Sequence, residues 1–323
     1  MDDYVLRVDD LTMHYTTRAG EVWAVDNVSF SLKKGQAMGL VGESGCGKTS
    51  IATSLLRLLP DNAVIKGGHI YLNSTDLVAL EEEEMRKIRW RRISMVFQAA
   101  MNALNPVYKV GDQIIEAMEN HGLVTNNEAA RNQVAELFRL VGLDPKLTEQ
   151  YPHEYSGGMR QRAVIAMALA CNPDLIIADE PTTALDVIVQ DNLLREMMVL
   201  QHNLHMSMIY ISHDIAVIAE VSDRIGVMYA GRLVELASAA EVFHHPLHPY
   251  TAGLMSAFPS IVGPKRALTT LPGEPPDLLH PPRGCRFHPR CQFATDICKQ
   301  EVPEFKDMGG GHYLACYHPM EAN

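Results

Sequence analysis

The chain lacks any long apolar run and is poor in basic side chains. No stretch approaches about 18 uninterrupted apolar residues, the length that a membrane-spanning helix needs, so we expect membrane contact only through a partner. No charged-then-apolar leader begins the chain, so we expect no secretory signal. Lys and Arg number 28 against 39 Asp and Glu, a formal charge of −11. This acid excess argues against sequence-independent binding of nucleic acid, which we do not expect as a partner.

What is present indicates a globular α/β protein of roughly two domains. Apolar strand-like segments alternate with helical ones, and a helical block interrupts this alternation. We expect an ATPase domain over 1–259, with a helical subdomain at about 100–165. After about Pro259 the chain becomes rich in Pro and Gly, so we expect an irregular carboxyl-terminal extension over 260–323.

The stretch GESGCGKT, Gly42 to Thr49, fits the phosphate-loop pattern G-x-x-x-x-G-K followed by Ser or Thr. It lies between a predicted strand and a predicted helix that Pro60 would stop. Glycines let backbone amides wrap a phosphate, Lys48 reaches the β and γ oxygens, and the Thr49 hydroxyl binds Mg²⁺. Cys46 stands where a small side chain is needed, so we expect a structural role for its thiol. The predicted nucleotide-binding residues of this loop are Gly42, Ser44, Gly45, Cys46, Gly47, Lys48, Thr49 and Ser50.

Two acids end the apolar strand-like segment LIIADEP. Asp179 would hold Mg²⁺ directly or through water, and Glu180 would polarise the attacking water. His213 follows another apolar segment, MSMIYIS, and its imidazole would touch the γ-phosphate. Together with the phosphate loop, these residues predict hydrolysis of ATP.

The stretch YSGGMRQR, Tyr155 to Arg162, resembles the signature motif of ABC-type ATPases. Gln98 after SMVF is similar to their Q-loop, TALD at Thr183 to Asp186 to their D-loop, and His213 to their switch histidine. The motifs follow the family order over residues of about 1 to 240. The resemblance implies a P-loop NTPase fold with a RecA-like α/β core, an antiparallel β subdomain and a helical subdomain that carries the signature.

The same resemblance implies roles for further residues. Ser156, Gly157 and Gly158 would close the ATP site of a second subunit in a head-to-tail dimer, with Asp186 also at the nucleotide. Gln98 would join Thr49 and Asp179 as a ligand of Mg²⁺, and it would pass the nucleotide state to a membrane subunit. Tyr15 lies where the family places an aromatic ring on adenine; a Tyr that packs in the core is the alternative.

A finer resemblance, carried by FQAAMNALNP and HHPLHPYTAGLMSAFP, is to the ATPase subunits of dipeptide and oligopeptide importers. It implies a second homologous ATPase subunit, two membrane permease subunits and an extracytoplasmic solute-binding protein as partners. The subunit would then lie peripherally on the cytoplasmic face of the membrane. Ala99 and Ala100 depart from the group's usual FQDPM, so oligosaccharides or nickel remain alternative solutes. A soluble ABC ATPase acting on DNA or ribosomes is the alternative of another class, but the chain has no coiled-coil insert and no second ATPase half.

Cysteine is scarce, yet four of the six cysteines lie in the tail, at Cys285, Cys291, Cys298 and Cys316. In a reducing cytosol such a group indicates a metal rather than disulfides. The spacings of five, six and seventeen residues lack the close pairs of zinc ribbons. Some importer ATPases with a similar tail carry a 4Fe–4S cluster, which we expect here; zinc or unliganded thiols are the alternatives.

We expect the cluster to order an arm with little apolar periodicity. The tail is far in sequence from every nucleotide motif, so loss of the cluster should leave nucleotide binding by the core nearly unchanged. A tail that senses redox state and gates the ATPase is the alternative.

Overall fold

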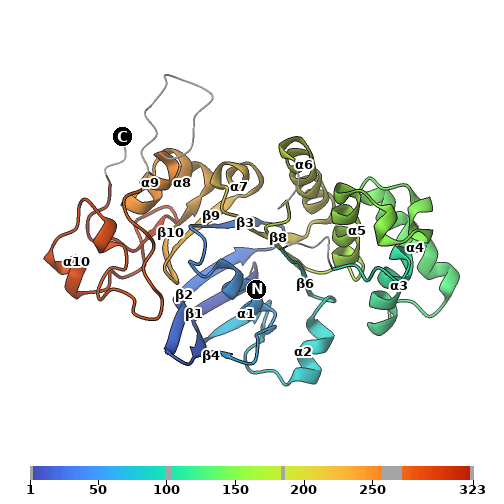
Figure 1. The fold of residues 1–323 in the computed structure, drawn as a ribbon, viewed down its shortest axis with the longest axis horizontal. Coiled ribbons are helices and arrows are strands. Elements are labelled where there is room, and N and C mark those ends of the chain that lie inside the picture. Colours follow the sequence, from blue (N-terminus) through green and yellow to red (C-terminus); the bar gives the residue numbers. More distant parts are fainter. Residues whose placement is uncertain (1–2, 99–102, 183–185, 257–270, 321–323) are drawn as a thin grey trace. The chain divides into compact units, whose positions relative to one another are not determined.

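The computed structural model describes residues 3–98, 103–182, 186–256 and 271–320 (Figure 1). The chain divides into two compact units. The first unit consists of Met1–Val5, Lys33–Gln36 and Ala79–Tyr210. The second consists of Leu6–Leu32, Ala37–Val78 and Ile211–Asn323. Among the described residues, no helix is both long and apolar enough to cross a membrane.

The second unit contains a four-stranded sheet in the order β2-β1-β4-β5. Its strands are β1 (Tyr4–Thr17), β2 (Gly20–Lys33), β4 (Ala63–Leu72) and β5 (Thr75–Asp76). β1 and β4 are antiparallel and pair Leu6 with Leu72. Burial alternates in the second half of β2, where Val28, Phe30 and Leu32 are buried, as expected for a strand with one face on the core. This sheet is the antiparallel β subdomain that the family resemblance implied.

The second unit also holds five strands in the order β11-β12-β10-β9-β3. They are β3 (Ala37–Val41), β9 (Arg224–Tyr229), β10 (Arg232–Ser238), β11 (Lys306–Asp307) and β12 (Tyr313–Leu314). β3 and β9 are parallel, and β9 and β10 form an antiparallel hairpin. β12 belongs to the tail and pairs with β10 through Glu235 and Leu314, so the tail adds strands to this sheet.

Short helices complete the second unit: α1 (Lys48–Leu55), α7 (Ile215–Val221), α8 (Ala239–His244), α9 (Pro249–Ser256), η4 (His288–Arg290) and α10 (Asp296–Gln300). α1 ends before Pro60, earlier than predicted, because Arg57 turns the chain with a φ of 50°. The described part of the tail, 271–320, is largely irregular, as expected, but it also contains two short strands: β12 pairs with β10, and β11 pairs with β12.

The first unit has three strands in the order β8-β7-β6 and most of the longer helices. The strands are β6 (Ile93–Val96), β7 (Leu175–Asp179) and β8 (Ser207–Ile211), whose last residue belongs to the second unit. β6 and β7 are parallel. The helices are α2 (Glu82–Ile88), α3 (Val110–Asn120), α4 (Asn127–Leu140), η2 (Pro145–Glu149), η3 (Pro152–Glu154), α5 (Gly157–Leu169) and α6 (Val187–Leu204).

The predicted helical block corresponds to α3, α4 and α5, which pack together with η2 (Figure 1). α3 buries Ile114 and Met118, and α4 buries Val134 and Phe138, each pair at a spacing of four residues. This spacing places each pair on one face of its helix. The boundary expected at residue 259 lies within 257–270, outside the described residues, so the domain limits stay a prediction.

Candidate functional site

The phosphate loop connects β3 to α1, as the sequence predicted. Gly42 and Gly47 have φ values of 147° and 106°, a region that side chains disfavour. A Cβ on Gly42 would lie 2.3 Å from the Met228 carbonyl oxygen, and one on Gly47 would lie 2.1 Å from that of Ala24. Glycine is therefore required at both positions for the loop to fold against β9 and β2.

Lys48 begins α1 and is buried, with 7% of its surface exposed. Its Nζ donates hydrogen bonds to the carbonyl oxygens of Gly42 at 2.7 Å and Glu43 at 3.0 Å. The backbone of the loop thus surrounds the ammonium group of Lys48. Ser44, Gly45 and Thr49 are exposed, so an incoming ligand can reach them.

Cys46 is buried within the same loop. Burial raises the pKa of this thiol above its usual value, although Lys48 beside it acts in the opposite direction. A buried, protonated thiol behaves as a small apolar side chain. This supports the structural role that we expected for Cys46.

Tyr15 lies beside the first turn of α1. Its hydroxyl shares a hydrogen bond with Ser50 Oγ at 3.2 Å, and the ring is half-buried on β1. The contact brings a predicted adenine-binding residue to the phosphate loop within the second unit. Stacking of Tyr15 on adenine stays a prediction. His213 follows β8 in the second unit and is exposed.

In the first unit, the two predicted acids stand at the end of β7. Asp179 is buried and Glu180 is half-buried. Glu180 has a φ of 46°, an uncommon conformation for a residue other than glycine and one that often occurs at functional sites. Gln98 Nε2 donates a hydrogen bond to Glu180 Oε2 at 2.9 Å. The sequence predicted both residues, but only the structure shows that they meet.

The signature residues begin α5, also in the first unit. Ser156 is the N-cap: its side chain accepts a hydrogen bond from the Met159 amide at 3.3 Å. Gly157 and Gly158 form the first turn, so their amides belong to the helix end that favours anions. Ser156 is exposed and both glycines are half-exposed. The geometry suits contact with a phosphate of another molecule.

Asp186 is the N-cap of α6, where its side chain accepts a hydrogen bond from the Val189 amide at 3.0 Å. The rest of the predicted D-loop, residues 183–185, lies outside the described residues. So do residues 99–102, which include the Ala99–Ala100 departure after the Q-loop.

Contact between the carboxyl-terminal tail and the phosphate loop was not predicted from the sequence. Arg290, in the tail, donates hydrogen bonds from Nη1 and Nη2 to the Oε2 and Oε1 atoms of Glu43 at 2.7 and 3.0 Å. The Tyr250 hydroxyl accepts a third hydrogen bond from the Glu43 amide at 3.0 Å. The tail is far from the nucleotide motifs in sequence but contacts the phosphate loop in the fold, because distance along the chain does not set distance in space. The expected effect of cluster loss on nucleotide binding stays a prediction. No sequence signal singled out these residues.

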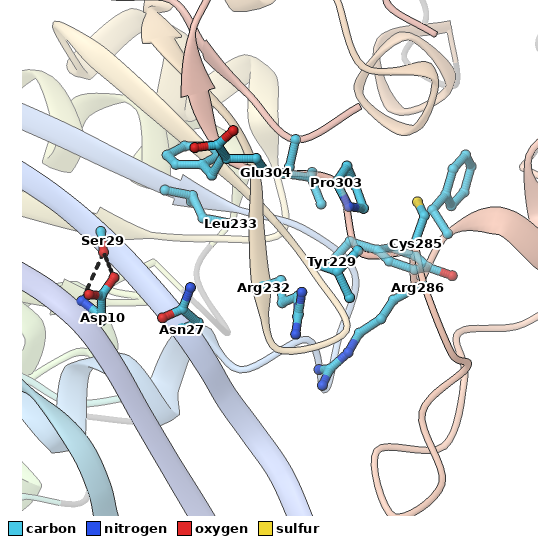
Figure 2. A pocket seen from close by; sticks show the side chains of 16 residues that line it. Asp10, Asn27, Ser29, Tyr229, Arg232, Leu233, Cys285, Arg286, Pro303 and Glu304 are labelled. Carbon is cyan, nitrogen blue, oxygen red and sulfur yellow. Dashed lines mark hydrogen bonds between the residues drawn. The ribbon is translucent and has the colours of Figure 1, made fainter. Parts of the chain in front are cut away.

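A second arginine anchors the same part of the tail. Arg286 Nη2 lies 2.5 Å from Asp26 Oδ2 on β2, and Arg232 Nη2 contacts that oxygen at 2.7 Å. Figure 2 shows Arg286 extending from the tail toward Arg232, beside a cavity of about 340 Å³. Removing one partner of a buried ion pair costs about 3–5 kcal/mol, because the remaining charge is left uncompensated. Loss of Arg286 should therefore disturb the contact of the tail with β2.

The four tail cysteines are free and line one small cavity. Burial raises the pKa of Cys285 and Cys291 above the usual range, and raises that of Cys316 to about 12. Within the described residues, no group of three or more His, Cys, Asp or Glu side chains is placed to hold a single metal ion. The structure thus gathers the predicted thiols around one cavity, and binding of a metal or cluster there stays a prediction.

A phosphate loop before a helix, paired acids at a strand end and a Ser-Gly-Gly helix start together define an ABC-type ATPase. Residues 25–183 match the ABC transporter family, and residues 234–298 match the oligopeptide/dipeptide transporter C-terminal region. Similar solved structures have the same fold. A dimeric ATP-binding cassette bound to ADP and Pi matches with a TM-score of 0.65 and 26% identity, over 72% of this chain and 98% of that chain. The cbiO1 protein of Clostridium perfringens, part of the cbiONQ complex, matches with a TM-score of 0.65 and 24% identity, over 76% and 92%.

Curated relatives cover nearly the whole chain. The oligopeptide transport ATP-binding protein OppD of Bacillus subtilis is 45% identical over 98% of this chain and 89% of its own. The dipeptide transport ATP-binding protein DppD of the same organism is 45% identical over 97% and 94%. OppD of Escherichia coli is 42% identical over 99% and 94%. The chain belongs to the ATP-binding subunits of the oligopeptide/dipeptide group of ABC transporters, and it is an ATPase.

Proposed function

We propose that this subunit binds ATP with Mg²⁺ and hydrolyses it to power the uptake of di- or oligopeptides. The main support for the proposed ATP site is the phosphate loop, in which Lys48 donates hydrogen bonds to backbone carbonyl oxygens. Peptides are favoured over oligosaccharides or nickel because the curated relatives are named for transport of dipeptides or oligopeptides.

The chain's own residues fit the nucleotide and its metal. Hydroxyl, amide and carboxylate oxygens are the ligands that Mg²⁺ prefers, and we propose Thr49, Gln98 and Asp179 for this role. Glu180 accepts a proton from the attacking water, and His213 contacts the γ-phosphate. When bound, Mg²⁺ neutralises charge that develops on the phosphates.

The partners follow from the exposed start of α5. Ser156, Gly157 and Gly158 bind the nucleotide of a second, homologous ATPase subunit, and Asp186 lies at the same nucleotide. The pair acts beneath two membrane permease subunits, at the cytoplasmic face, with solute delivered by an extracytoplasmic binding protein. Supporting this arrangement are the family match, the dimeric state of one similar cassette and the acidic charge, which does not favour nucleic acid.

Replacing Lys48 with Ala tests the nucleotide site. We expect ATP affinity to fall at least about tenfold, because the phosphates lose a buried cation. Uptake of labelled peptide into vesicles that carry the complex should stop as well. Titration with a fluorescent ATP analogue measures the first effect. Lys34→Ala, which alters an exposed lysine outside the loop, is the control and should behave as wild type. Wild-type affinity in Lys48→Ala would rule out the assigned role.

We also propose a 4Fe–4S cluster held by Cys285, Cys291, Cys298 and Cys316. Its support is that these four free thiols line one cavity. Nearby His288, His312 and His318 hydrogen-bond instead to Cys285, Glu235 and Thr295.

Protein purified without oxygen should be brown and contain about four irons and four sulfides per chain. Changing any one of the four cysteines to Ser should bleach it, whereas Cys171→Ser, at a buried cysteine outside the tail, should not. Absorbance and metal analysis decide the matter: one zinc and no iron, or four freely alkylated thiols, would contradict the cluster.

A further inference from the structure

Glu43 places a negative charge within the phosphate loop, directly after Gly42. A carboxylate here would repel the phosphates of a nucleotide, because like charges a few ångströms apart disfavour one another. The carboxylate is instead turned onto Arg290 through two hydrogen bonds. Side chains of Glu43 and Arg290 are 26% and 5% exposed, so solvent screens this pair little.

Arg290 is itself fixed by the tail and by β9. Its Nε donates to the Pro272 carbonyl oxygen at 2.8 Å, and its Nη1 lies 3.4 Å from the Tyr229 hydroxyl. The guanidinium also lies 5.7 Å from the centre of the Tyr229 ring. These contacts, together with the two hydrogen bonds to Glu43, hold the planar guanidinium in one orientation, which in turn orients the Glu43 carboxylate.

The backbone of Glu43 is held from the same side. Its amide donates to Tyr250 on α9, whose ring centre lies 4.6 Å from Tyr229 and 5.4 Å from Phe287. Phe287 and Tyr229 are themselves in edge contact at 5.1 Å. This aromatic group forms a packed connection between the phosphate loop and the tail.

The same tail residues border the cavity of the four cysteines. Arg290 directly precedes Cys291, and Phe287 lies between Cys285 and Cys291 and lines the cavity. The Cys291 amide donates to His288 across η4, the short helix that ends at Arg290. The cysteines and Arg290 therefore belong to one short segment of the tail.

We propose that Arg290 is a positioning residue for ATP binding, and that it links the four-cysteine cavity to the phosphate loop. It neutralises Glu43 and holds the carboxylate away from the site of the phosphates. The loop then presents Lys48 and the backbone amides without an opposing charge. Disturbance of the tail cysteines releases Arg290 and weakens binding of ATP.

The test is a titration of the purified full-length subunit with a fluorescent ATP analogue. Arg290→Ala should raise the Kd about tenfold, because it leaves the Glu43 carboxylate uncompensated. Glu43→Gln alone should change the Kd by less than about twofold, and the double variant Glu43→Gln/Arg290→Ala should return it close to wild type. Arg283→Ala, at an exposed arginine of the same tail, is the matched control. A double variant as weak as Arg290→Ala would overturn the proposal, since it would show a purely structural loss.

A second arm tests the link to the cysteines. Cys291→Ser should weaken ATP binding when Glu43 is present and should have little effect in the Glu43→Gln background. Equal weakening in both backgrounds, or none in either, would overturn the link.

If Arg290→Ala does not fold, as judged by its thermal melting, Arg290→Lys replaces it. Lysine keeps the positive charge but loses the bidentate contact with Glu43, so we expect a Kd between those of wild type and Arg290→Ala. If Arg290→Lys and Glu43→Gln both bind ATP with the wild-type Kd, the bidentate contact between Arg290 and Glu43 does not position the loop for ATP. The titrations of the Arg290 and Glu43 variants alter no proposed cluster ligand and need no peptide, so their outcome is separate from those proposals.

Discussion

ATP turnover by the assembled complex is expected to fall about 100-fold or more when Glu180 is replaced by Gln, while ATP binding is retained. Glutamine has nearly the same shape and can still meet Gln98, which lies 2.9 Å from Glu180 Oε2. It cannot accept a proton from water, so the loss falls on the chemical step. Phosphate release at saturating ATP and a separate nucleotide titration distinguish the two effects.

The partner ATPase must be controlled for, because it contributes a site of its own. The measurement is therefore made in complexes whose partner subunit carries the same substitution at its equivalent glutamate. Glu83→Gln, at an exposed acid on α2, serves as the matched control and should leave turnover unchanged. Wild-type turnover in the Glu180→Gln variant would show that Glu180 is not the general base.

Replacing Gly158 with Glu should abolish ATP-driven pairing of the two ATPase subunits, while the isolated subunit still binds ATP. Gly158 lies in the first turn of α5, and a carboxylate there would face the γ-phosphate of the partner's nucleotide. The fold should tolerate the change, because an acid stabilises a helix amino terminus. A Cβ at this position would lie 3.3 Å from Val189 Cγ1, a tight contact that a side-chain shift can relieve.

Light scattering with and without ATP measures this pairing, and hydrolysis by the full complex reports its consequence. Gly158→Ala separates charge from bulk: it adds the Cβ without the carboxylate, so a much smaller loss is expected. Normal hydrolysis by the Gly158→Glu complex would show that the signature does not contact nucleotide.

Several features follow from short stretches of sequence because their causes are local. The phosphate loop needs glycine where φ is positive, and Gly42 and Gly47 stand at those positions. The start of α5 also has a local cause, because the Ser156 side chain accepts a hydrogen bond from the Met159 amide three residues on. The alternating apolar residues Val28, Phe30 and Leu32 predict the second half of β2, because they are buried on one face.

The amino-acid sequence by itself determined the phosphate loop and the capped start of α5, because loop geometry and helix capping depend on neighbours a few positions away. Only the tertiary structure decided which distant residues meet. Gln98 reaches Glu180 across 82 positions, and Arg290 reaches Glu43 across 247. Such contacts depend on how strands and helices pack, and the spacing of residues along the chain carries no trace of that packing. For this reason the tail, which the sequence set apart from the nucleotide motifs, lies against the phosphate loop.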